Sequence, residues 1–323
     1  MKHMVLSYIA LIMIFFTCSV MAAEKPVRMA YLQNDIHHLA LWVALEEGLF
    51  KKHGEEVKVE GVFRAGPEIM SAFAAGALDM AYVGEAPATT AVANSAADVT
   101  VVSQVNTEGS ALVVATTGDS GINELADLAG RTVAVPGHST VQDFLLQRAL
   151  SRAGVTAGKV NIMVLKPPEM ITALKTSQID AFIAWEPYPA KAATMGAGRS
   201  LASSRQMWPD HPCCVLAADT GFYRASPKRV EKVLAAHFEA TRFIKDHPDK
   251  ALAIGVKYTG MDEDTVRLAM ETVNYTCDLS ISGEKEYVEF LSGLKYISVK
   301  DADAFIKKFI DPAPLEKIKG QRP

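Results

Sequence analysis

Short apolar runs alternate with segments of helical spacing along most of the chain. Residues 27–31 and 99–105 are typical of buried strands, and residues 56–60 alternate like a strand with one solvated face. Residues 39–52 carry apolar side chains at helical spacing, and Gly54 supplies a stop. Strands that alternate with helices predict βαβ units, and therefore an α/β fold with mostly parallel sheets.

One part of this pattern occurs twice, first over residues 67–85 and again over residues 168–186. Each copy predicts a short helix opened by proline, a turn, an aspartate, a buried strand and a loop that carries glutamate. Two similar α/β halves can set equivalent loops on the two sides of a cleft, so the repeat predicts a two-lobed clamp for a small molecule. Five residues of the first copy have identical partners in the second: Pro67, Glu68, Ala72, Asp79 and Glu85.

Two later apolar segments mark the expected lobe boundaries. Residues 110–115 are predicted to carry the chain into the second lobe, and residues 213–218 to close that lobe and return the chain. We therefore expect a discontinuous first lobe of residues 24–110 and 220–323, and a second lobe of residues 111–219. Helices are expected near the end of the chain over 230–246, 250–258, 262–275 and 299–309.

The first 22 residues have the order of a secretory signal peptide. Lys2 and His3 precede an apolar run over residues 4–16, and small residues ending at Ala22 offer a cleavage site. This predicts export to the periplasm and a mature protein that begins at or near Ala23. The apolar run is shorter than the roughly 20 residues that span a bilayer, but an uncleaved signal would serve as a membrane anchor. Cys18 also leaves open the alternative that the protein is a lipoprotein with a lipid on this cysteine.

Composition and charge limit the kinds of domain and partner that are expected. The 323 residues are 49% hydrophobic with a net charge of −4, which suits two domains with buried cores. No basic run with interleaved aromatic residues is present, so nucleic acid is not an expected partner. With Cys18 in the signal, the mature chain keeps Cys213, Cys214 and Cys277. An odd number, with two cysteines adjacent, does not form a disulfide framework.

Four motifs in order carry a family resemblance: LWVALEEGLFKKHG (41–54), AAGALD (74–79), DLAGRTVAVP (127–136) and AWEP (184–187). The chain resembles the nitrate/sulfonate/taurine-type solute-binding proteins of ABC importers, a group that includes binders of thiamine precursors. The resemblance implies the type II periplasmic-binding-protein clamp with a two-strand hinge, which closes on its solute like a venus flytrap. It also implies a monomer that captures a small polar organic solute and delivers it to a membrane permease.

The expected ligand contacts lie in the loops that follow strands, because ligands of open α/β sheets bind beyond the carboxyl ends of the strands. Helix N-termini there present free N–H groups that suit anions. Ser139 and Thr140 begin a helix, and we expect one to cap it and the other to touch ligand. The full set of expected ligand-binding residues is Gln33, Asn34, His37, His38, Gly66, Gly84, Glu85, Ser110, His138, Ser139, Thr140, Trp185, Glu186, His211 and Cys213.

Two glutamates bear on the class of solute. Glu85 and Glu186 end the repeated strands at the expected mouth, so they favour a solute with an amine or another donor over a bare anion such as nitrate. Trp185 would cover a flat or cationic face of that solute. Either glutamate would alternatively latch the lobes through a salt bridge. The repeated aspartates, Asp79 and Asp180, begin strands and are predicted to be structural.

Histidines and cysteines raise the question of a metal. His37, His38, His138, His211 and Cys213 can converge near one cleft, but their spacing matches no standard zinc motif. We therefore expect hydrogen-bonding histidines, and neither a metal nor a cofactor.

Catalysis is the alternative class. A pyrimidine synthase of thiamine biosynthesis is similar in fold and carries a cysteine cluster that Cys213 and Cys214 echo. That enzyme is intracellular and depends on pyridoxal phosphate, so a signal peptide argues against it. The sequence also contains no nucleophile elbow or phosphate loop. We expect a binding protein rather than an enzyme. A ligand-sensing module of a membrane receptor would use the same cleft and stays open, as does the identity of the solute.

Overall fold

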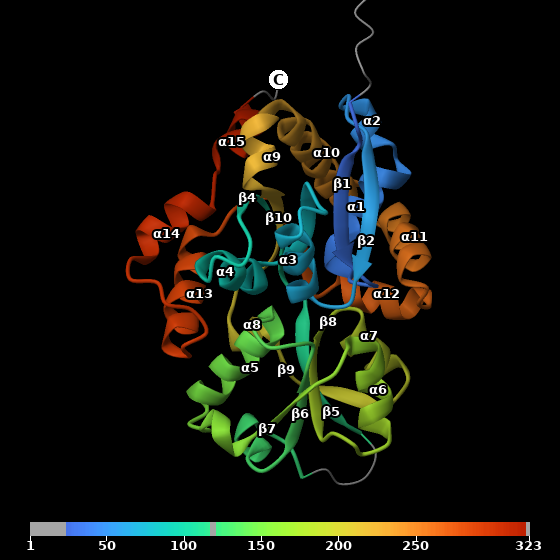
Figure 1. Cartoon of the computed structure of the whole chain (residues 1–323). Helices are drawn as coiled ribbons and strands as arrows, with labels where there is room; N and C mark the ends of the chain where they lie inside the picture. The colour runs from blue at the N-terminus through green and yellow to red at the C-terminus, as the bar shows by residue number, and fades with distance from the viewer. Residues whose placement is uncertain (1–23, 117–120, 321–323) are drawn as a thin grey trace, which may run out of the picture.

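The computed structural model describes residues 24–116 and 121–320, so the predicted signal peptide, Cys18 and the cleavage site at Ala23 lie outside the described residues. Two lobes are stacked end to end, each built around its own sheet (Figure 1). Within the described part of the chain, no helix is both long and apolar enough to cross a membrane.

The first lobe holds a six-stranded sheet. Its strands in spatial order are β11 (Val273–Tyr275), β4 (Val99–Glu108), β10 (Pro212–Asp219), β3 (Met80–Gly84), β1 (Val27–Leu32) and β2 (Val57–Phe63). The helices that precede the crossing are η1 (Ile36–His38), α1 (Leu39–Glu46), α2 (Leu49–Lys52), α3 (Gly66–Ala74) and α4 (Glu85–Ala93). After the return come α9 (Thr220–Ala225), α10 (Pro227–Asp246), α11 (Pro248–Thr259), α12 (Glu263–Met270), α13 (Ile281–Gly293), α14 (Ala302–Phe309) and α15 (Ala313–Gly320). In Figure 1, α13 and α14 lie on the opposite side of the lobe from α11 and α12.

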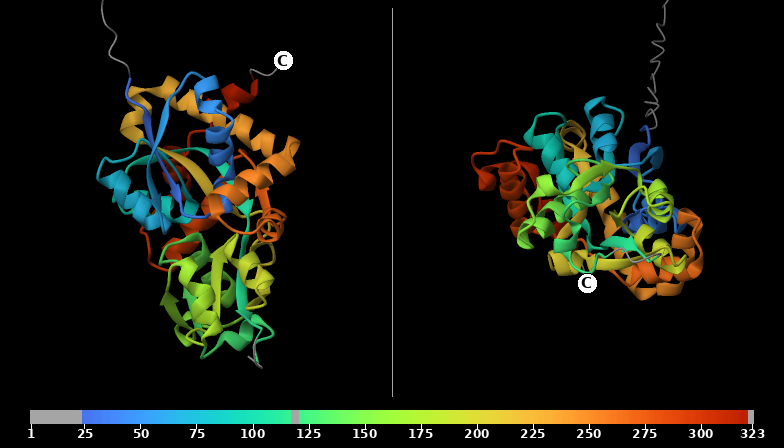
Figure 2. Two further views of the ribbon diagram at one scale, coloured as in Figure 1. Left: turned by 90° about the vertical axis from the view of Figure 1, so that its right-hand side faces the viewer. Right: turned by 90° about the horizontal axis from the view of Figure 1, so that it is seen from below.

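The second lobe holds a five-stranded sheet. Its strands in spatial order are β7 (Asn161–Val164), β6 (Thr132–Val135), β8 (Ala181–Trp185), β5 (Ser110–Ala115) and β9 (Gly198–Ser203). The helices of this lobe are η2 (Leu125–Leu128), α5 (Val141–Arg152), η3 (Ala157–Lys159), α6 (Pro167–Lys175), α7 (Tyr188–Thr194) and α8 (Ser204–Met207). Figure 2 shows from the side that this lobe meets the first along one end only.

The sheets are mixed rather than mostly parallel, and one strand belongs to the other lobe than predicted. β1 is parallel to β2 and β3, but β10 runs antiparallel between β3 and β4. In the second sheet β6 is parallel to β7 and β8, whereas β5 is antiparallel to β8 and β9. The prediction that residues 213–218 close the second lobe is therefore wrong, because they lie in β10 of the first sheet. An apolar strand buried on both faces fits either sheet, so its pattern does not identify its partners.

Two predicted helices are also shorter than expected. The helix predicted over 39–52 breaks at Gly48, whose φ of +64° is left-handed and ends α1 before α2 begins. The helix predicted over 262–275 ends at Met270, and the chain then enters β11, where Val273 pairs with Glu108. That pairing covers the outer edge of β4, the strand that leads into the second lobe.

The crossing between the lobes passes directly beside a histidine. β4 ends at Glu108 and β5 begins at Ser110, so on this first crossing Gly109 is the single residue between the two sheets. Gly109 has a φ of +81°, and a Cβ there would lie 2.3 Å from Nε2 of His37. Glycine is therefore required both by the backbone conformation and by the close approach of the imidazole.

Candidate solute-binding site

The structure brings the ends of strands from both lobes together around a small cavity of about 10 Å³. The first lobe contributes the end of β1, the starts of α3 and α4, and β10. The second lobe contributes the start of α5 and the end of β8. The lining residues are Leu32, Asp35, His37, Gly66, Gly84, Pro87, Thr140, Val141, Gln142, Trp185, Cys213 and Cys214.

The predicted site residues divide among this cavity and its two neighbours. His37, Gly66, Gly84, Thr140, Trp185 and Cys213 line the central cavity. Ser110 and Glu186 line a cavity of about 310 Å³ beside the crossing, and His138 and Ser139 line one of about 360 Å³ on the α3–α4 side. The remaining predicted residues of the described chain line none of these three cavities: Gln33, Asn34, His38, Glu85 and His211.

Asp35, Gln142 and Cys214 line the central cavity but were not predicted. Asp35 caps the η1 turn by accepting a hydrogen bond from the N–H of His37 at 3.0 Å. Its place between Asn34 and His37 was a usable signal, because aspartate before a helical turn is a common cap. Adjacent residues of a regular strand face opposite sides of the sheet, so a pattern that places Cys213 at the cleft does not by itself place Cys214 there.

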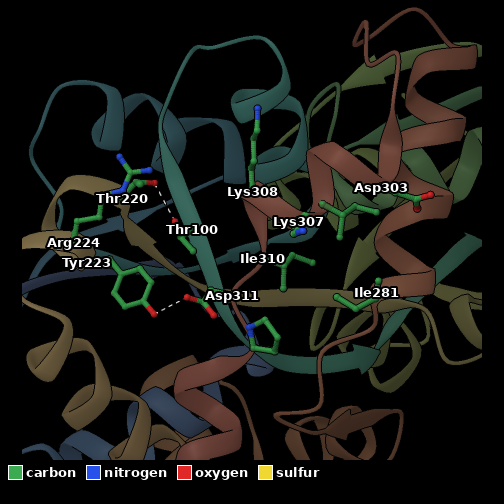
Figure 3. Close-up of a pocket in the computed structure, with 12 residues that line it drawn as sticks. Thr100, Thr220, Tyr223, Arg224, Ile281, Asp303, Lys307, Lys308, Ile310 and Asp311 are labelled. Carbon is green, nitrogen blue, oxygen red and sulfur yellow. Dashed lines mark hydrogen bonds between the residues drawn. The ribbon is translucent and has the colours of Figure 1, made fainter.

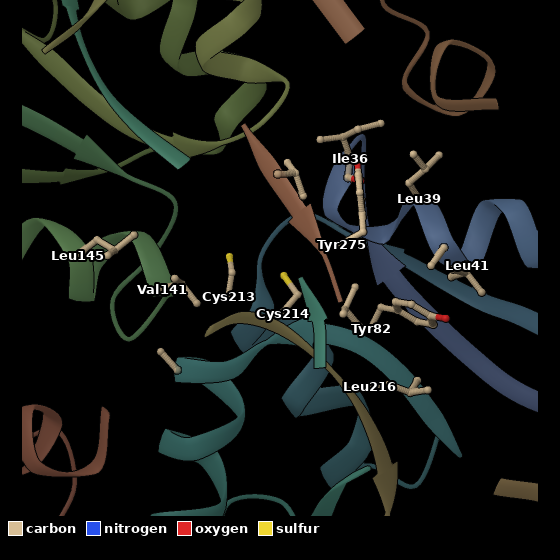
Figure 4. Close-up of a cluster of buried hydrophobic side chains, with 14 of the residues drawn as sticks. Ile36, Leu39, Leu41, Tyr82, Val141, Leu145, Cys213, Cys214, Leu216 and Tyr275 are labelled. Carbon is tan, nitrogen blue, oxygen red and sulfur yellow. The ribbon is translucent and has the colours of Figure 1, made fainter. Parts of the chain in front are cut away.

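A bulge in β10 explains why both cysteines reach the same place. The register of β10 against β4 shifts between Pro212 and Cys214 and again between Cys214 and Val215. Such bulges re-aim side chains. Sγ of Cys213 and Sγ of Cys214 lie 3.6 and 3.7 Å from Nδ1 of His37. Figure 4 shows both sulfur atoms on the same side of the strand, between Val141 and Tyr275.

His37 is fully buried and tied on both ring nitrogens. Nε2 lies 2.7 Å from the carbonyl oxygen of Gly109, and Nδ1 lies 3.3 Å from Oδ1 of Asp35. Burial lowers the pKa of His37, but the nearby charges of Asp35 and Cys213 outweigh it and raise that pKa to about 10. Burial raises the pKa of Cys213, yet the hydrogen bond from Cys214 and the charge of His37 bring it well below its ordinary value. The two buried groups thus favour one another's charged forms.

The other buried histidines play the hydrogen-bonding roles that were expected. The backbone N–H of Leu32 donates to Nδ1 of His38 at 3.1 Å, so the proton of the neutral ring is on Nε2. Burial, helped by the charge of His37, lowers the pKa of His38 well below its usual value. His211 stacks on Trp208, and its Nδ1 lies 3.0 Å from the carbonyl oxygen of Pro212.

Glu85 does not face the second lobe, contrary to the expectation that it would hold solute opposite Glu186. The side-chain amide of Gln104 donates to Oε2 of Glu85 at 3.1 Å, and Glu284 of α13 hydrogen-bonds to it from the same lobe. Burial raises the pKa of Glu85 to about 7. The first-lobe carboxylate that lies in the cavity wall is Asp35, whose pKa burial likewise raises to about 7.

Glu186 and Trp185 lie at the junction, as predicted. Oε2 of Glu186 accepts from the N–H of Ala190 at 3.0 Å, and its carbonyl oxygen accepts from the N–H of Ile36 in the other lobe at 3.2 Å. Burial raises the pKa of Glu186 to about 7, although the N–H of Ala190 and the charge of His37 lower it. The indole N–H of Trp185 is buried without an acceptor among the described residues.

Close packing accounts for the glycines and for Thr140. A Cβ on Gly66 would lie 2.5 Å from Cγ of Pro87, and one on Gly84 would lie 3.2 Å from Cγ2 of Val141 in the second lobe. Thr140 caps α5: its Oγ1 accepts from the N–H of Asp143 at 3.2 Å and donates to the carbonyl oxygen of Gly137 at 2.8 Å. Of the two hydroxyl residues, Thr140 therefore caps the helix, while Ser139 lies beside the outer cavity.

A larger cavity of about 650 Å³ lies elsewhere, between α9, α14 and β4 of the first lobe (Figure 3). Its lining comes from one lobe only, and the hydroxyl of Tyr223 donates to Oδ2 of Asp311 across it at 2.8 Å. A ligand there would touch one lobe and so would give no free energy to a closure between two. The central cavity, which residues of both lobes line, is therefore the candidate site.

Solved structures that superpose on this two-lobed arrangement include periplasmic binding proteins. The nitrate-binding protein of Synechocystis superposes with a TM-score of 0.81 at 15% identity, over 91% of this chain and 88% of that one. The aliphatic sulphonate binding protein of Escherichia coli superposes with a TM-score of 0.74 at 21% identity, over 89% of this chain and 98% of that one. The fold is thus the periplasmic-binding-protein clamp.

The family follows from sequence. Residues 22–256 match the NMT1-like family, so the chain belongs to it. A protein of Brucella abortus, whose name gives it a provisional binding role without a ligand, is 28% identical over 295 residues, or 88% of this chain and 90% of that protein. The resemblance that the four motifs indicated is confirmed at the level of family and fold.

Proposed function

We propose that this chain is an extracytoplasmic solute-binding protein that captures a small polar organic solute between its lobes and delivers it to an ABC importer. The observation that carries the proposal is the composition of the central cavity wall, in which Asp35 and His37 of one lobe face Thr140 and Trp185 of the other. A solute that touches both walls favours the closed arrangement over the open one. The binding roles in the names of the related proteins support the same conclusion.

The wall offers both donors and acceptors. The starts of α3, α4 and α5 converge there, and helix N-termini present free N–H groups and partial positive charge. The indole N–H of Trp185 adds a buried donor. Asp35 supplies a carboxylate to this wall, and Glu186 of the other lobe supplies one to the cavity beside the crossing. This combination suits a solute with an anionic end and an amine or similar donor, such as a taurine-like sulfonate or a thiamine-precursor-like heterocycle, better than nitrate.

The described arrangement is a closed one. A cavity of about 10 Å³ has room for about one water-sized probe, so a solute of several heavy atoms enters only when the lobes separate. Ion pairs across the junction, such as Lys191 with Asp262 at 2.7 Å, hold the lobes together. We infer that the cycle consists of opening, capture and closure.

The remaining parts of the proposal follow from this role. We infer a monomer, exported to the periplasm, whose partners are the solute and a membrane permease. We also infer that it binds without catalysing a reaction, because a carrier must release its solute unchanged.

Retained ligand and closure test the proposal together. Protein purified from the periplasm would be examined by native mass spectrometry, then by thermal shift with taurine, alkanesulfonates, thiamine precursors and nitrate. A solute at about 100 times its dissociation constant adds roughly 2.7 kcal/mol to the free energy of unfolding, and small-angle scattering should show compaction. Tight binding without compaction, or conversion of the bound compound, would contradict the proposal.

A further inference from the structure

Four side chains with metal-binding atoms meet on the first-lobe side of the cavity. His37, Cys213 and Cys214 offer ligand atoms that all lie within 4.8 Å of one another, and Asp35 lies within the same distance of Cys214. All four are buried. We propose that they form a binding site for a divalent cation of the zinc class, which goes beyond solute transport. Its core ligands are His37, Cys213 and Cys214, whose ligand atoms lie mutually within that distance. Asp35, which lies within it of Cys214 and 3.3 Å from Nδ1 of His37, is proposed as the fourth.

The distances match tetrahedral zinc. With Zn–S bonds of about 2.3 Å and Zn–N and Zn–O bonds of about 2.1 Å, tetrahedral geometry separates N from S by about 3.6 Å and N from O by about 3.4 Å. Nδ1 of His37 lies 3.6 Å from Sγ of Cys213 and 3.7 Å from Sγ of Cys214. Oδ1 of Asp35 lies 3.3 Å from the same nitrogen. All three spacings agree with those of one shared ion to within about 0.2 Å, the tolerance expected of a real site.

The surroundings orient the ligands as in known metal sites. A metal-binding histidine usually donates its other N–H to a carbonyl or carboxylate, and Nε2 of His37 lies 2.7 Å from the carbonyl oxygen of Gly109. This leaves Nδ1 directed at the two sulfur atoms. His38 is not a ligand, because its Nδ1 accepts from Leu32 and its proton is therefore on Nε2. That N–H lies 3.8 Å from Oδ2 of Asp35, beyond hydrogen-bonding distance.

Two further observations indicate a ligand. Oδ2 of Asp35 is buried with no hydrogen-bond partner among the described residues, and such an atom is costly unless something satisfies it. In addition, only the bulge in β10 brings both cysteines to one point. Two thiolates and an imidazole are the donors that zinc prefers over harder cations.

The location of the ligands separates this site from solute capture. Asp35 and His37 lie between β1 and α1, and both cysteines lie on β10, so all four belong to the first lobe. The site therefore persists when the lobes open, and metal binding should not drive closure. The ion would form part of the cleft wall, next to Thr140 and Trp185 of the second lobe.

Metal content and the Co²⁺ spectrum test the proposal. The full mature chain, purified without chelators, should carry about one zinc per molecule by elemental mass spectrometry. After the zinc is removed by chelation, added Co²⁺ should give a thiolate-to-cobalt charge-transfer absorption with the intensity expected for two thiolate ligands. The visible absorption bands should be those of a tetrahedral Co²⁺ site. Zn²⁺ should raise the melting temperature without compaction in small-angle scattering. No retained metal and no such Co²⁺ spectrum would overturn the site.

Cysteine variants supply the matched control. Cys213→Ser and Cys214→Ser should each weaken Zn²⁺ binding by more than the roughly 10–100-fold of an outer-shell loss. Cys277→Ser should retain wild-type metal, because Cys277 is equally buried but donates to Thr241 at 3.4 Å, away from the cluster. Equal retention in all three variants would contradict the proposal. If a variant fails to fold, the chelation and Co²⁺ measurements on the unaltered chain decide. Loss of solute binding with metal retained would count against the proposed transport role alone.

Discussion

The repeated segment gives each lobe its own α–β corner, and the two corners can be compared residue by residue. The first comprises α3 and β3, the second α6 and β8. At the start of the strand the copies agree. The N–H of Arg28 donates to Oδ2 of Asp79 at 2.8 Å, and the N–H of Thr132 donates to Oδ2 of Asp180 at 2.8 Å. Each aspartate ties its strand to the neighbouring one, so its role is structural, although it was predicted to cap a turn.

The copies also agree at the start of the helix. Glu68 pairs with Lys166 at 2.8 Å, and its counterpart Glu169 pairs with Arg64 at 2.5 Å. Each glutamate thus reaches across the junction to a basic residue of the opposite lobe. The latch that was considered for Glu85 or Glu186 is formed by this earlier pair.

The copies differ at the end of the strand. Glu85 turns into its own lobe toward Gln104 and Glu284, whereas Glu186 stays at the junction near His37. α13, which follows the return of the chain to the first lobe, brings Glu284 to Glu85. A repeated residue therefore keeps its role where its partners are repeated too, and loses it where a neighbour belongs to one lobe only.

Replacing the repeated aspartates should show how much each contributes to the free energy of unfolding. Asp79 also accepts two guanidinium hydrogen bonds from Arg28, whereas Arg131 lies 3.5 Å from the more exposed Asp180. Asp79→Ala should lower the free energy of unfolding by about 3 kcal/mol and Asp180→Ala by about 1 kcal/mol, given the range for charged hydrogen bonds. Urea unfolding measures both. Equal losses would mean that the guanidinium contacts contribute nothing.

Replacing the repeated glutamates should separate binding from folding. Glu186→Gln should weaken solute binding by about 1.5–3 kcal/mol, the range for a charged hydrogen bond. Its melting temperature without solute should hardly change, because glutamine still accepts from Ala190. Glu85→Gln is the matched control and should leave affinity unchanged. Calorimetric titration of both variants checks this, and the reverse result would place the solute in the first lobe.

The pair of Glu85 and Glu284 should give an unusual pH dependence. Burial raises the pKa of Glu284 well above its ordinary value, and that of Glu85 to about 7. The folded state therefore holds a proton that the unfolded state releases. The contribution of this proton to the free energy of unfolding is fully present below about pH 4.5. It falls as pH rises toward 7, by up to about 1.4 kcal/mol per pH unit per proton.

Glu284→Gln should remove much of that slope. The amide can donate to Glu85 as the protonated acid does, and can still accept from Thr89, which bonds Glu284 at 2.8 Å. The variant should melt higher than the parent at pH 8 and nearly equally at pH 5. Thermal unfolding across this range measures the difference. A lower melting temperature at pH 8 would mean that both carboxylates are ionised and otherwise stabilised.

The sequence predicted the elements that depend on local pattern and missed those that depend on distant partners. The repeat indicated both corners, and the four motifs indicated family and clamp. The sheet that β10 joins was missed because Val215 and Leu216 suit burial in either lobe. Cys214 was missed because a bulge depends on the partner strand. The neighbour of Glu85 was missed because Glu284 lies far along the chain.

The smallest expected effect comes from the reciprocal latch. Glu68, Glu169, Lys166 and Arg64 are partly exposed, and exposed ion pairs contribute about 0–1 kcal/mol each. Glu68→Gln with Glu169→Gln should therefore weaken solute binding by at most about thirtyfold, and less at high salt, where screening already weakens the pairs. Each single variant should cause about half of that loss in free energy, since the pairs are equivalent. Titrations at low and high salt measure it; a loss that is independent of salt would show that these glutamates position α3 and α6 rather than hold the lobes together.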